Sequence, residues 1–449
     1  MAETIPIFLV QKEQLNDQPT VRQTWLSASG FKAEAGTFCL IPGREGQVES
    51  VLVGKSDDLN TWSLGGLART LPPHAYHLAD KLSATEQSKL ALGWQLGQYQ
   101  FTRYKQSGSN DNMPKLTVVS DGDWAKYLDA ATEATYLVRD LVNTPAADMG
   151  PAHLEQQARA IATTYKAEIA VTTGEELLAQ NYPMIYTVGK ASDQPPRLID
   201  LHWGDPKAPK ITLVGKGVCF DSGGLDIKPA SGMKTMKKDM GGAAHVLGVA
   251  TLVMKLNLPV RLRVLIPAVE NSIAGNAMHP LDVLPTRKGI TVEVGNTDAE
   301  GRLVLGDALW EASSENPDLL IDFATLTGAA RVALGTELPA FFCNDEAIAT
   351  QLKDAGEATD DPLWNLPLHA PYRTLLDSKV ADISNISDGR FGGAITAALF
   401  LREFIKPQIP WVHIDVMAWN LRSLPGRPEG GEAMGMRAVF ELIRRQVQP

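Results

Sequence analysis

Two carboxylates and a guanidinium fall at alternating positions of one short segment, Asn296–Leu303, which reads Asn-Thr-Asp-Ala-Glu-Gly-Arg-Leu. Asp298, Glu300 and Arg302 are separated only by an alanine and a glycine. In an extended segment, side chains at every second position point to the same side. We therefore expect the three charged groups to converge, with little side-chain bulk between them.

The flanking residues place this acidic segment between a strand and a helix. Gly289–Gly295 is typical of a short strand, and Leu303–Trp310 has apolar residues at helical spacing. Such a strand, turn and helix favour a site at the edge of a sheet. The simpler interpretation of any Asp-x-Glu is a solvated turn whose acids cap the following helix.

Further acids upstream favour a metal site over this simpler interpretation. Asp221 lies among glycines in Lys210–Lys228, and Asp239 opens Asp-Met-Gly-Gly-Ala-Ala. Four acids at turns after strands or at helix starts can build an oxygen-rich site for divalent metals. Asp239 has a compatible structural alternative, as the N-cap of a helix through Gly241–Val246.

The first third of the chain is predicted to be a small α/β domain, residues 1–125. It contains one predicted helix, Ala84–Gln100, and no catalytic constellation. The predicted strands are Ile5–Val10, Thr37–Leu40, Val48–Val53 and Leu116–Val119.

The rest of the chain alternates apolar strand-like runs with helical ones, which predicts an α/β domain, residues 151–449, with a mixed, largely parallel sheet covered by helices on both faces. The helix Trp124–Val142 and the proline-containing loop after it place a linker at residues 126–150. The predicted strands are Glu168–Thr172, Met184–Val188, Leu198–His202, Ile211–Val214, Val260–Ile266, Leu319–Ala324 and Trp411–Val416. The predicted helices are His153–Tyr165, Ala243–Lys255, Leu303–Ser314 and Ala394–Phe404.

The composition, 44% hydrophobic and 21% charged over 449 residues, is that of a soluble globular protein. The net charge of -10 gives no overall attraction to nucleic acid or anionic membranes. Cys39, Cys219 and Cys343 are far apart, which favours reduced thiols over a disulfide framework. With no basic region before the short apolar run at the start and no bilayer-length apolar stretch, we expect a cytoplasmic location and no membrane partner.

The acidic segments resemble the leucine aminopeptidase (cytosol aminopeptidase) family of two-metal exopeptidases. The resemblance extends from about Asn143 onward, and the octapeptide Asn296–Leu303 is its most specific part. The other segments that carry it are Val214–Gly224, Met236–Ala244, Asp322–Ala330 and Gly392–Ala398.

The resemblance implies a pair of divalent metals, Zn or Mn with Mg or Co as further possibilities. Lys216, Asp221, Asp239 and Glu300 would ligate the tighter ion, and Asp221, Asp298 and Glu300 the looser one, with roughly 3.5–4 Å between the ions. Lys216 can bind metal only as the neutral amine, and a nearby dication can lower its pKa accordingly. A lone lysine is otherwise a solvated surface charge.

The resemblance also implies catalytic and substrate-binding roles. Lys228 would stabilise the oxyanion, and Arg302 would hold a bicarbonate ion as general base for a hydroxide bridging the metals. Met236 would line the pocket for the N-terminal side chain, and the backbone of Thr325 and Leu326 would bind peptide. The family further implies a leucyl-type preference and a homo-hexamer that the N-terminal domain helps assemble.

Other residues and functions remain alternatives. Asp226 and Asp307 fall outside the family's ligand positions, His245 is expected to be a core residue, and His279 matches no ligand position. A two-metal phosphoesterase, a DNA-binding accessory role and an inactive scaffold are the competing functions. The lysine ligand and the octapeptide favour the peptidase, and the acidic balance makes nucleic acid an unlikely partner.

Overall fold

The computed structural model describes residues 4–106, 112–117 and 122–448, and it divides into two compact units. One unit holds the chain up to Tyr136 together with Leu421–Glu429. The other holds Leu137–Asn420 and the chain from Gly430 onward. Helix α3 (Asp123–Asn143) contributes residues to both units. The extents given above for the two domains and the linker stay a prediction.

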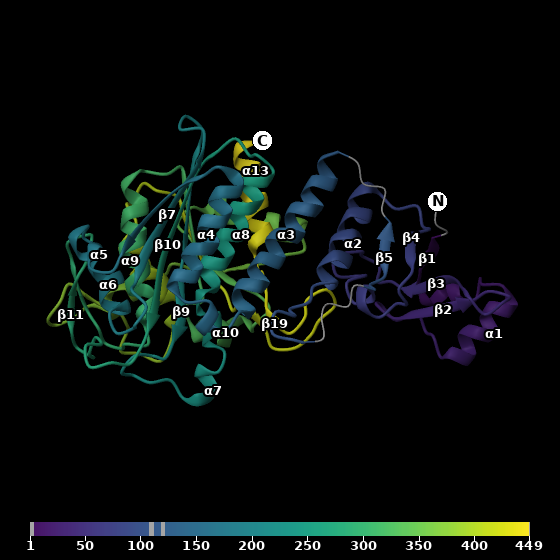
Figure 1. Ribbon diagram of the computed structural model, residues 1–449, viewed down its shortest axis with the longest axis horizontal. Helices are drawn as coiled ribbons and strands as arrows, with labels where there is room; N and C mark the ends of the chain where they lie inside the picture. The colour runs from purple at the N-terminus through teal and green to yellow at the C-terminus, as the bar shows by residue number, and fades with distance from the viewer. Residues whose placement is uncertain (1–3, 107–111, 118–121, 449) are drawn as a thin grey trace. The chain divides into compact units, whose positions relative to one another are not determined.

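The first unit is an α/β fold built on a sheet with the strand order β2-β3-β1-β4-β5 (Figure 1). Strand β1 pairs in parallel with β3 and β4, while β2 is antiparallel. The predicted strands and helix are confirmed, except that Val118 and Val119 lie outside the described residues. The elements are β1 (Ile5–Val10), α1 (Thr20–Ser29), β2 (Phe38–Pro42), β3 (Val48–Gly54), β4 (Ala75–Leu78), α2 (Ala84–Gly97) and β5 (Lys115–Thr117).

The second unit is organised around a mixed sheet with the strand order β15-β14-β17-β13-β8-β10-β7-β6, and β9 pairs with β10. The neighbours β17, β13, β8 and β10 run parallel, whereas β14, β7 and β6 bring antiparallel pairings. This confirms the predicted mixed, largely parallel sheet. The strands are β6 (Glu168–Thr173), β7 (Arg197–Gly204), β8 (Lys210–Gly215), β9 (Gly217–Asp221), β10 (Arg261–Asn271), β13 (Leu319–Ala324), β14 (Ala340–Cys343), β15 (Trp364–Asn365) and β17 (Trp411–Asp415).

Helices cover both faces of this sheet (Figure 1). Helices α4 (Pro151–Tyr165) and α8 (Gly241–Lys255) lie on one face, and α6 (Pro183–Gly189) and α9 (Glu300–Ser314) on the other. Helix α8 is buried along almost its whole length, which accounts for its nearly continuous apolar sequence. The remaining longer helices are α10 (Gly328–Leu334), α11 (Glu346–Ala358), α12 (Gly393–Arg402) and α13 (Met436–Val447).

The strand predicted at Met184–Val188 is wrong, because these residues form helix α6. A short buried apolar run does not distinguish helix from strand by periodicity. Pro183 occupies the first turn, and the buried carboxylate of Asp307 accepts the N–H groups of Met184 (2.8 Å) and Ile185 (3.4 Å). A carboxylate distant in sequence thus satisfies the free N–H groups at the helix start.

In the described part of the chain, no helix combines the length and apolar character needed to cross a bilayer.

Candidate metal centre

The site lies where neighbouring parallel strands of the large sheet end. Lys216 follows β8, Thr325 follows β13, and Asp415 is the last residue of β17. The register aligns Phe323 with Gly215 and Ala324 with Asp415, so these strands end side by side. The carboxyl ends of parallel strands are the usual place for a ligand site in an α/β sheet.

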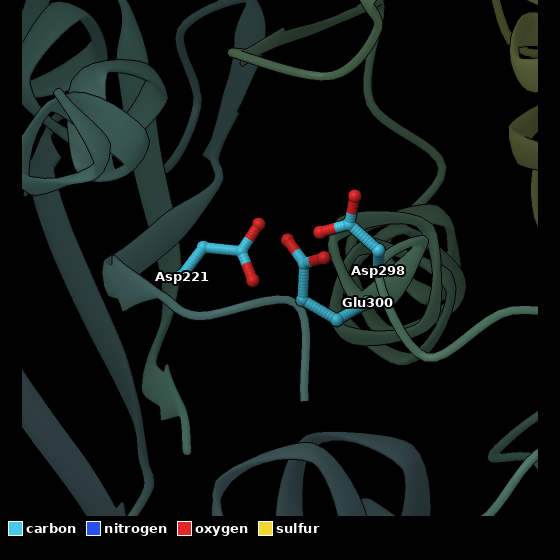
Figure 2. A group of neighbouring side chains, drawn as sticks. All are labelled: Asp221, Asp298 and Glu300. Carbon is cyan, nitrogen blue, oxygen red and sulfur yellow. The ribbon is translucent and has the colours of Figure 1, made fainter. Parts of the chain in front are cut away.

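Three carboxylates converge beside this edge of the sheet. Asp221 comes from the end of β9, Asp298 from the turn before α9, and Glu300 from the first residue of α9. Their side chains point toward one another, and one oxygen of each lies within 4.8 Å of the others (Figure 2). Asp221 and Glu300 are buried, and Asp298 is partly exposed. This spacing suits a shared cation.

The convergence of Asp298 and Glu300 is confirmed, but the extended geometry predicted for their segment is wrong. The Asn296 side chain accepts the Asp298 N–H at 2.7 Å in a turn, and the helix begins at Glu300. The turn formed by Asn296 and the packing of α9 thus replace the extended conformation that the alternating charged residues had indicated. Gly301 permits the approach of Lys216, because a Cβ there would lie 2.8 Å from Lys216 Nζ.

Asp239 is not the N-cap of α8, contrary to the structural alternative. Helix α8 begins at Gly241 after Met240, which makes no side-chain cap, and Asp239 lies in a preceding 3-10 turn, η4 (Met236–Met240). The Asp239 carboxylate instead accepts the Thr325 hydroxyl at 2.7 Å and faces Lys216. These two partners orient the buried carboxylate toward the cluster.

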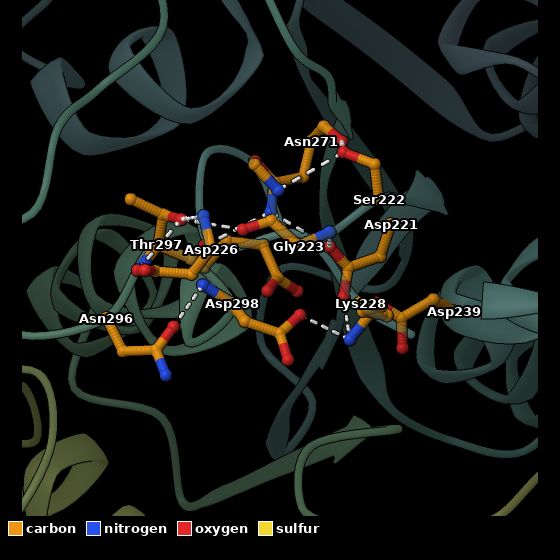
Figure 3. Close-up of polar contacts among 12 residues, drawn as sticks. Asp221, Ser222, Gly223, Asp226, Lys228, Asp239, Asn271, Asn296, Thr297 and Asp298 are labelled. Atoms are coloured by element: carbon orange, nitrogen blue, oxygen red, sulfur yellow. Dashed lines mark hydrogen bonds and ion pairs between the residues drawn. The ribbon is translucent and has the colours of Figure 1, made fainter. Parts of the chain in front are cut away.

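Two lysines supply the cationic charge among the acids. Lys216 Nζ lies 2.7 Å from Asp239 Oδ2 and 2.8 Å from Glu300 Oε1. Lys228 Nζ lies 2.8 Å from Asp221 Oδ2 and also forms an ion pair with Asp298 (Figure 3). The five predicted ligands and Lys228 are therefore linked by ion pairs or lie within the same acidic cluster, although they are far apart in the sequence.

Burial and neighbouring charges both shift the pKa values of these groups. Burial, reinforced by the negative charge of Asp221, raises the pKa of Glu300. Burial also raises the pKa of Asp298. Burial disfavours the Lys216 ammonium, but Asp239 and Glu300 outweigh it and raise the Lys216 pKa. The carboxylates thus hold Lys216 protonated, whereas a dication at the same carboxylates would replace the ammonium as their counter-charge.

The residues present fit divalent metals. Asp239 Oδ2, Asp298 Oδ1 and Glu300 Oε1 are buried and have no hydrogen-bond partner of good geometry among the described residues. The charges that they face are the two lysine ammonium groups. Buried carboxylate oxygens without hydrogen-bond donors favour a cation, and carboxylates with one amine suit Zn, Mn or Mg.

Arg302 lies in the first turn of α9 and borders the same cavity. Its guanidinium donates a hydrogen bond to the backbone carbonyl of Asn385. Burial lowers the Arg302 pKa to about 10, against the opposing negative charges of Asp415 and Glu300. No ion pair with Asp298 or Glu300 is formed, so Arg302 is not the structural partner of its neighbouring acids.

A cavity of about 390 Å³ opens beside the acids, a size that suits a small ligand. Met236, Thr325 and Leu326, for which the resemblance implies substrate-binding roles, are among its lining residues. The N–H groups of Leu326 and Thr327 donate to Asp415, which also accepts the Thr327 hydroxyl at 2.6 Å. Asp415 therefore fixes the segment that borders the cavity.

Three residues at the cavity were not predicted from the sequence: Asp415, Lys238 and Arg331. The signal for Asp415 was an acid at the end of an otherwise apolar strand. Lys238 and Arg331 line the cavity, and burial lowers the Lys238 pKa to about 8. A lysine in Met-Lys-Lys-Asp and an arginine on a helix carry no sequence signal that separates them from surface charges.

Other candidate residues lie where a structural role was expected. Asp226 accepts the Thr297 N–H at 2.8 Å, and His245 is a buried residue of α8 that accepts the Met434 N–H at 2.9 Å. Asp307 stabilises the start of α6 as described above. His279 is exposed beside Asp282.

Comparison with known proteins decides the family. The model of the cytosol aminopeptidase family catalytic domain matches residues 136–440, and that of the M17 aminopeptidase N-terminal domain matches residues 5–118. The chain belongs to the cytosol aminopeptidase family. It is accordingly a metal-dependent aminopeptidase, a metallo-exopeptidase of the hydrolase class, and the family uses paired divalent metal ions.

Individual relatives agree with this membership of the cytosol aminopeptidase family. A probable cytosol aminopeptidase of Leifsonia xyli subsp. xyli is 40% identical, over 93% of this chain and 89% of that protein. The crystal structure of the cytosol aminopeptidase from Coxiella burnetii is 50% identical with a TM-score of 0.95, over 100% of this chain and 98% of that one. The bottromycin maturation enzyme BotP in complex with Mn is 33% identical with a TM-score of 0.90, over 100% of both chains.

Proposed function

We propose that this cytosol aminopeptidase removes the N-terminal residue of peptides, with a leucyl-type preference, at a two-metal site. Lys216, Asp221, Asp239 and Glu300 would hold the tighter ion, and Asp221, Asp298 and Glu300 the looser one. The supporting observation is the convergence of five donor groups from four segments beside one cavity. When bound, two divalent ions lower the pKa of water and polarise the scissile carbonyl.

Lys228 and Arg302 carry the catalytic roles in this proposal. The Lys228 ammonium already lies within ion-pair distance of Asp221 and Asp298, so it is placed to donate to negative charge that develops on the peptide carbonyl oxygen. Arg302 points a planar, partly free guanidinium toward the same cavity, which suits a carbonate-like anion. A bicarbonate held there would accept a proton from the attacking water and later return one to the leaving amine.

The substrate is oriented by groups on two sides of the cavity. Among the described residues that line the cavity, only these acids form a cluster of negative charge. The positively charged α-amine of the peptide would therefore bind near Asp298. Met236 would contact the N-terminal side chain, and the backbone around Thr325 and Leu326 would bind the peptide. This orientation explains why a free N-terminus is required. We further propose a homo-hexamer in the cytoplasm, with residues 1–125 assisting assembly and 151–449 catalysing.

A substrate panel tests the proposal against the phosphoesterase alternative. Leucyl-, alanyl- and glutamyl-p-nitroanilides, an N-acetylated leucyl-p-nitroanilide and bis-p-nitrophenyl phosphate would be assayed with and without chelator. We expect chelator-sensitive hydrolysis of the free-amine anilides, fastest for leucine among the uncharged residues. Hydrolysis of the phosphodiester alone, or of the acetylated anilide at the same rate as the free one, would contradict an aminopeptidase.

A further inference from the structure

Five cationic side chains line the cavity, and two of them form neither a hydrogen bond nor an ion pair with the described residues. Lys216 and Lys228 are ion-paired with acids of the cluster, and Arg302 donates to a backbone carbonyl. Within the described parts of the chain, neither Lys238 nor Arg331 forms a hydrogen bond or ion pair through its side chain. Both nevertheless border the cavity.

The burial of Lys238 makes this arrangement unusual. Lys238 is 1% exposed and lies on η4, two residues after Met236, while Arg331 is half-buried on α10. A buried ammonium without an anion is costly, and it is usually retained only where something compensates it. Lys238 and Arg331 line the same cavity of about 390 Å³, so both cations face one ligand-sized space.

The neighbouring acids Asp239 and Asp415 act on Lys238 through their charge, but they form no ion pair with it or with Arg331. Asp239 faces Lys216 and Thr325, and both oxygens of Asp415 are taken by Leu326 and Thr327. Divalent ions bound at the acidic cluster would neutralise the negative charge of its carboxylates, in addition to Lys216 and Lys228. The region around Lys238 and Arg331 therefore remains positive and lined with free donors, which favours an anionic group of the ligand.

We propose that Lys238 and Arg331 form a carboxylate-binding subsite that makes this aminopeptidase accept acidic N-terminal residues, glutamate and aspartate. The inference rests on the proposed function, because it places the α-amine at the acidic cluster. Lys238 is adjacent to Asp239 in the chain and shares η4 with Met236. The substrate group nearest to Lys238 is therefore the side chain of the N-terminal residue.

The two cations could also bind a second kind of carboxylate, the free C-terminus of a dipeptide. Kinetics of Glu-Ala-amide against Gln-Ala-amide isolate the side-chain carboxylate, because the two peptides are nearly isosteric. Gln-Ala against Gln-Ala-amide isolates the C-terminal one. We expect the metal-loaded wild type to favour Glu-Ala-amide over Gln-Ala-amide in kcat/KM by about 10-fold or more, since a charge-assisted hydrogen bond contributes on that order.

Substitution assigns the preference to the two cations. Lys238→Met and Arg331→Met should each lower the Glu/Gln ratio by about 10-fold, to near one, and Arg331→Lys should retain most of the wild-type ratio. Lys234→Met is the matched control, because Lys234 is an exposed lysine that is not part of the cavity lining. This control should keep the wild-type ratio. Metal content and urea midpoints of all variants separate lost recognition from lost folding.

Three outcomes decide the inference. A Glu/Gln ratio that depends on both cations supports the inference as stated. A preference for Gln-Ala over Gln-Ala-amide that depends on both cations supports the same subsite, but with the C-terminal carboxylate of the peptide as the bound group. The inference is overturned if both the Glu/Gln ratio and the ratio of free to amidated Gln-Ala are near one in the wild type. It is also overturned if both ratios are unchanged in Lys238→Met and Arg331→Met. If no peptide is hydrolysed, the proposed function fails separately. Calorimetric binding of L-glutamate against L-glutamine, which contain no bond to cleave, then still tests the subsite.

Discussion

Glu300 and Lys216 form a buried ion pair, with 2.8 Å between Glu300 Oε1 and Lys216 Nζ. The first residue of α9 is thereby linked to the residue that follows β8, and Gly301 provides the space for the lysine stem. The proposed metal site uses the same two groups as ligands. In the proposal Lys216 would therefore have two roles, as counter-ion of the acids without metal and as amine ligand with metal.

Lys216→Ala is the first prediction. In the metal-free protein it leaves Asp239 and Glu300 buried without a counter-charge, so the free energy of unfolding should fall by about 3–5 kcal/mol. The variant should also bind the tighter metal more weakly. Urea unfolding of the metal-free protein and elemental analysis of the loaded protein measure the two effects. Unchanged stability together with unchanged metal content would show that Lys216 has neither role.

Lys228→Ala should separate catalysis from metal binding. We expect both metals to remain and kcat to fall by about 10²–10³-fold, because Lys228 would act as an oxyanion donor. Metal content is measured beside turnover of leucyl-p-nitroanilide, with Lys234→Ala as an exposed-lysine control. If Lys228→Ala loses metal while Lys216→Ala keeps it, the roles of the two lysines are exchanged.

Asp298→Ala should abolish the looser metal site while the fold is kept, because Asp298 is the partly exposed member of the acidic cluster. Turnover should fall by about 10³-fold or more, since metal charge stabilisation contributes several kcal/mol. Elemental analysis and circular dichroism accompany the assay. Two full metal equivalents with normal turnover would rule out the assignment of Asp298.

Arg302→Ala should keep both metals and nearly the same KM, because Arg302 contacts neither the acids nor the pocket for the N-terminal side chain. Its kcat should fall less than that of Asp298→Ala, since water substitutes poorly for bicarbonate. In carbonate-depleted buffer at fixed pH, added bicarbonate should stimulate the wild type and have much less effect on the variant. An equal response of both proteins would place bicarbonate elsewhere, and no response in either would refute this step.

Asp307 should make stability depend on pH. Burial raises its pKa from 3.8 to about 7, so folding favours the protonated carboxyl. Its stabilising contribution is full below about pH 4 and is lost as the pH rises through about 7. The unfolding free energy of the wild type minus that of Asp307→Asn should therefore fall by about 1.4 kcal/mol per pH unit between pH 5 and 7.

Urea unfolding at pH 5, 6, 7 and 8 measures this difference. Asp354→Asn, at an exposed position of α11, is measured in parallel as the matched control. A difference between wild type and Asp307→Asn that rises with pH would reverse the assigned direction of the Asp307 pKa.

The sequence predicted most strands of the large sheet because each is a buried apolar run between turn residues. It also predicted the segments of the site, since Asn296–Leu303 combines acids with small residues in an unusual order. It failed at Met184–Val188, where a distant carboxylate, Asp307, stabilises a helix start. Contacts between segments far apart in the chain are not visible in local patterns.

The same limit explains the errors at the site itself. The turn at Asn296 is also held by a distant residue, because the Asn385 side chain accepts the Asn296 N–H at 3.3 Å and donates to the Asn296 carbonyl at 2.8 Å. The Asp239 carboxylate is likewise oriented by Thr325, from another strand end. Lys238 resembles any surface lysine in the sequence, and only its burial beside the cavity distinguishes it. The types of chemistry were therefore predictable from residue composition, whereas the directions of side chains were not.

The most direct test of the two-metal aminopeptidase is a titration of chelated, dialysed protein with Mn²⁺, followed by hydrolysis of the peptide Leu-Gly-Gly with mass-spectrometric identification of products. We expect activity to rise until two equivalents per chain are bound, with free leucine and Gly-Gly as the first products. Full activity in metal-free protein, saturation at one equivalent, or release of glycine from the C-terminus would contradict the account.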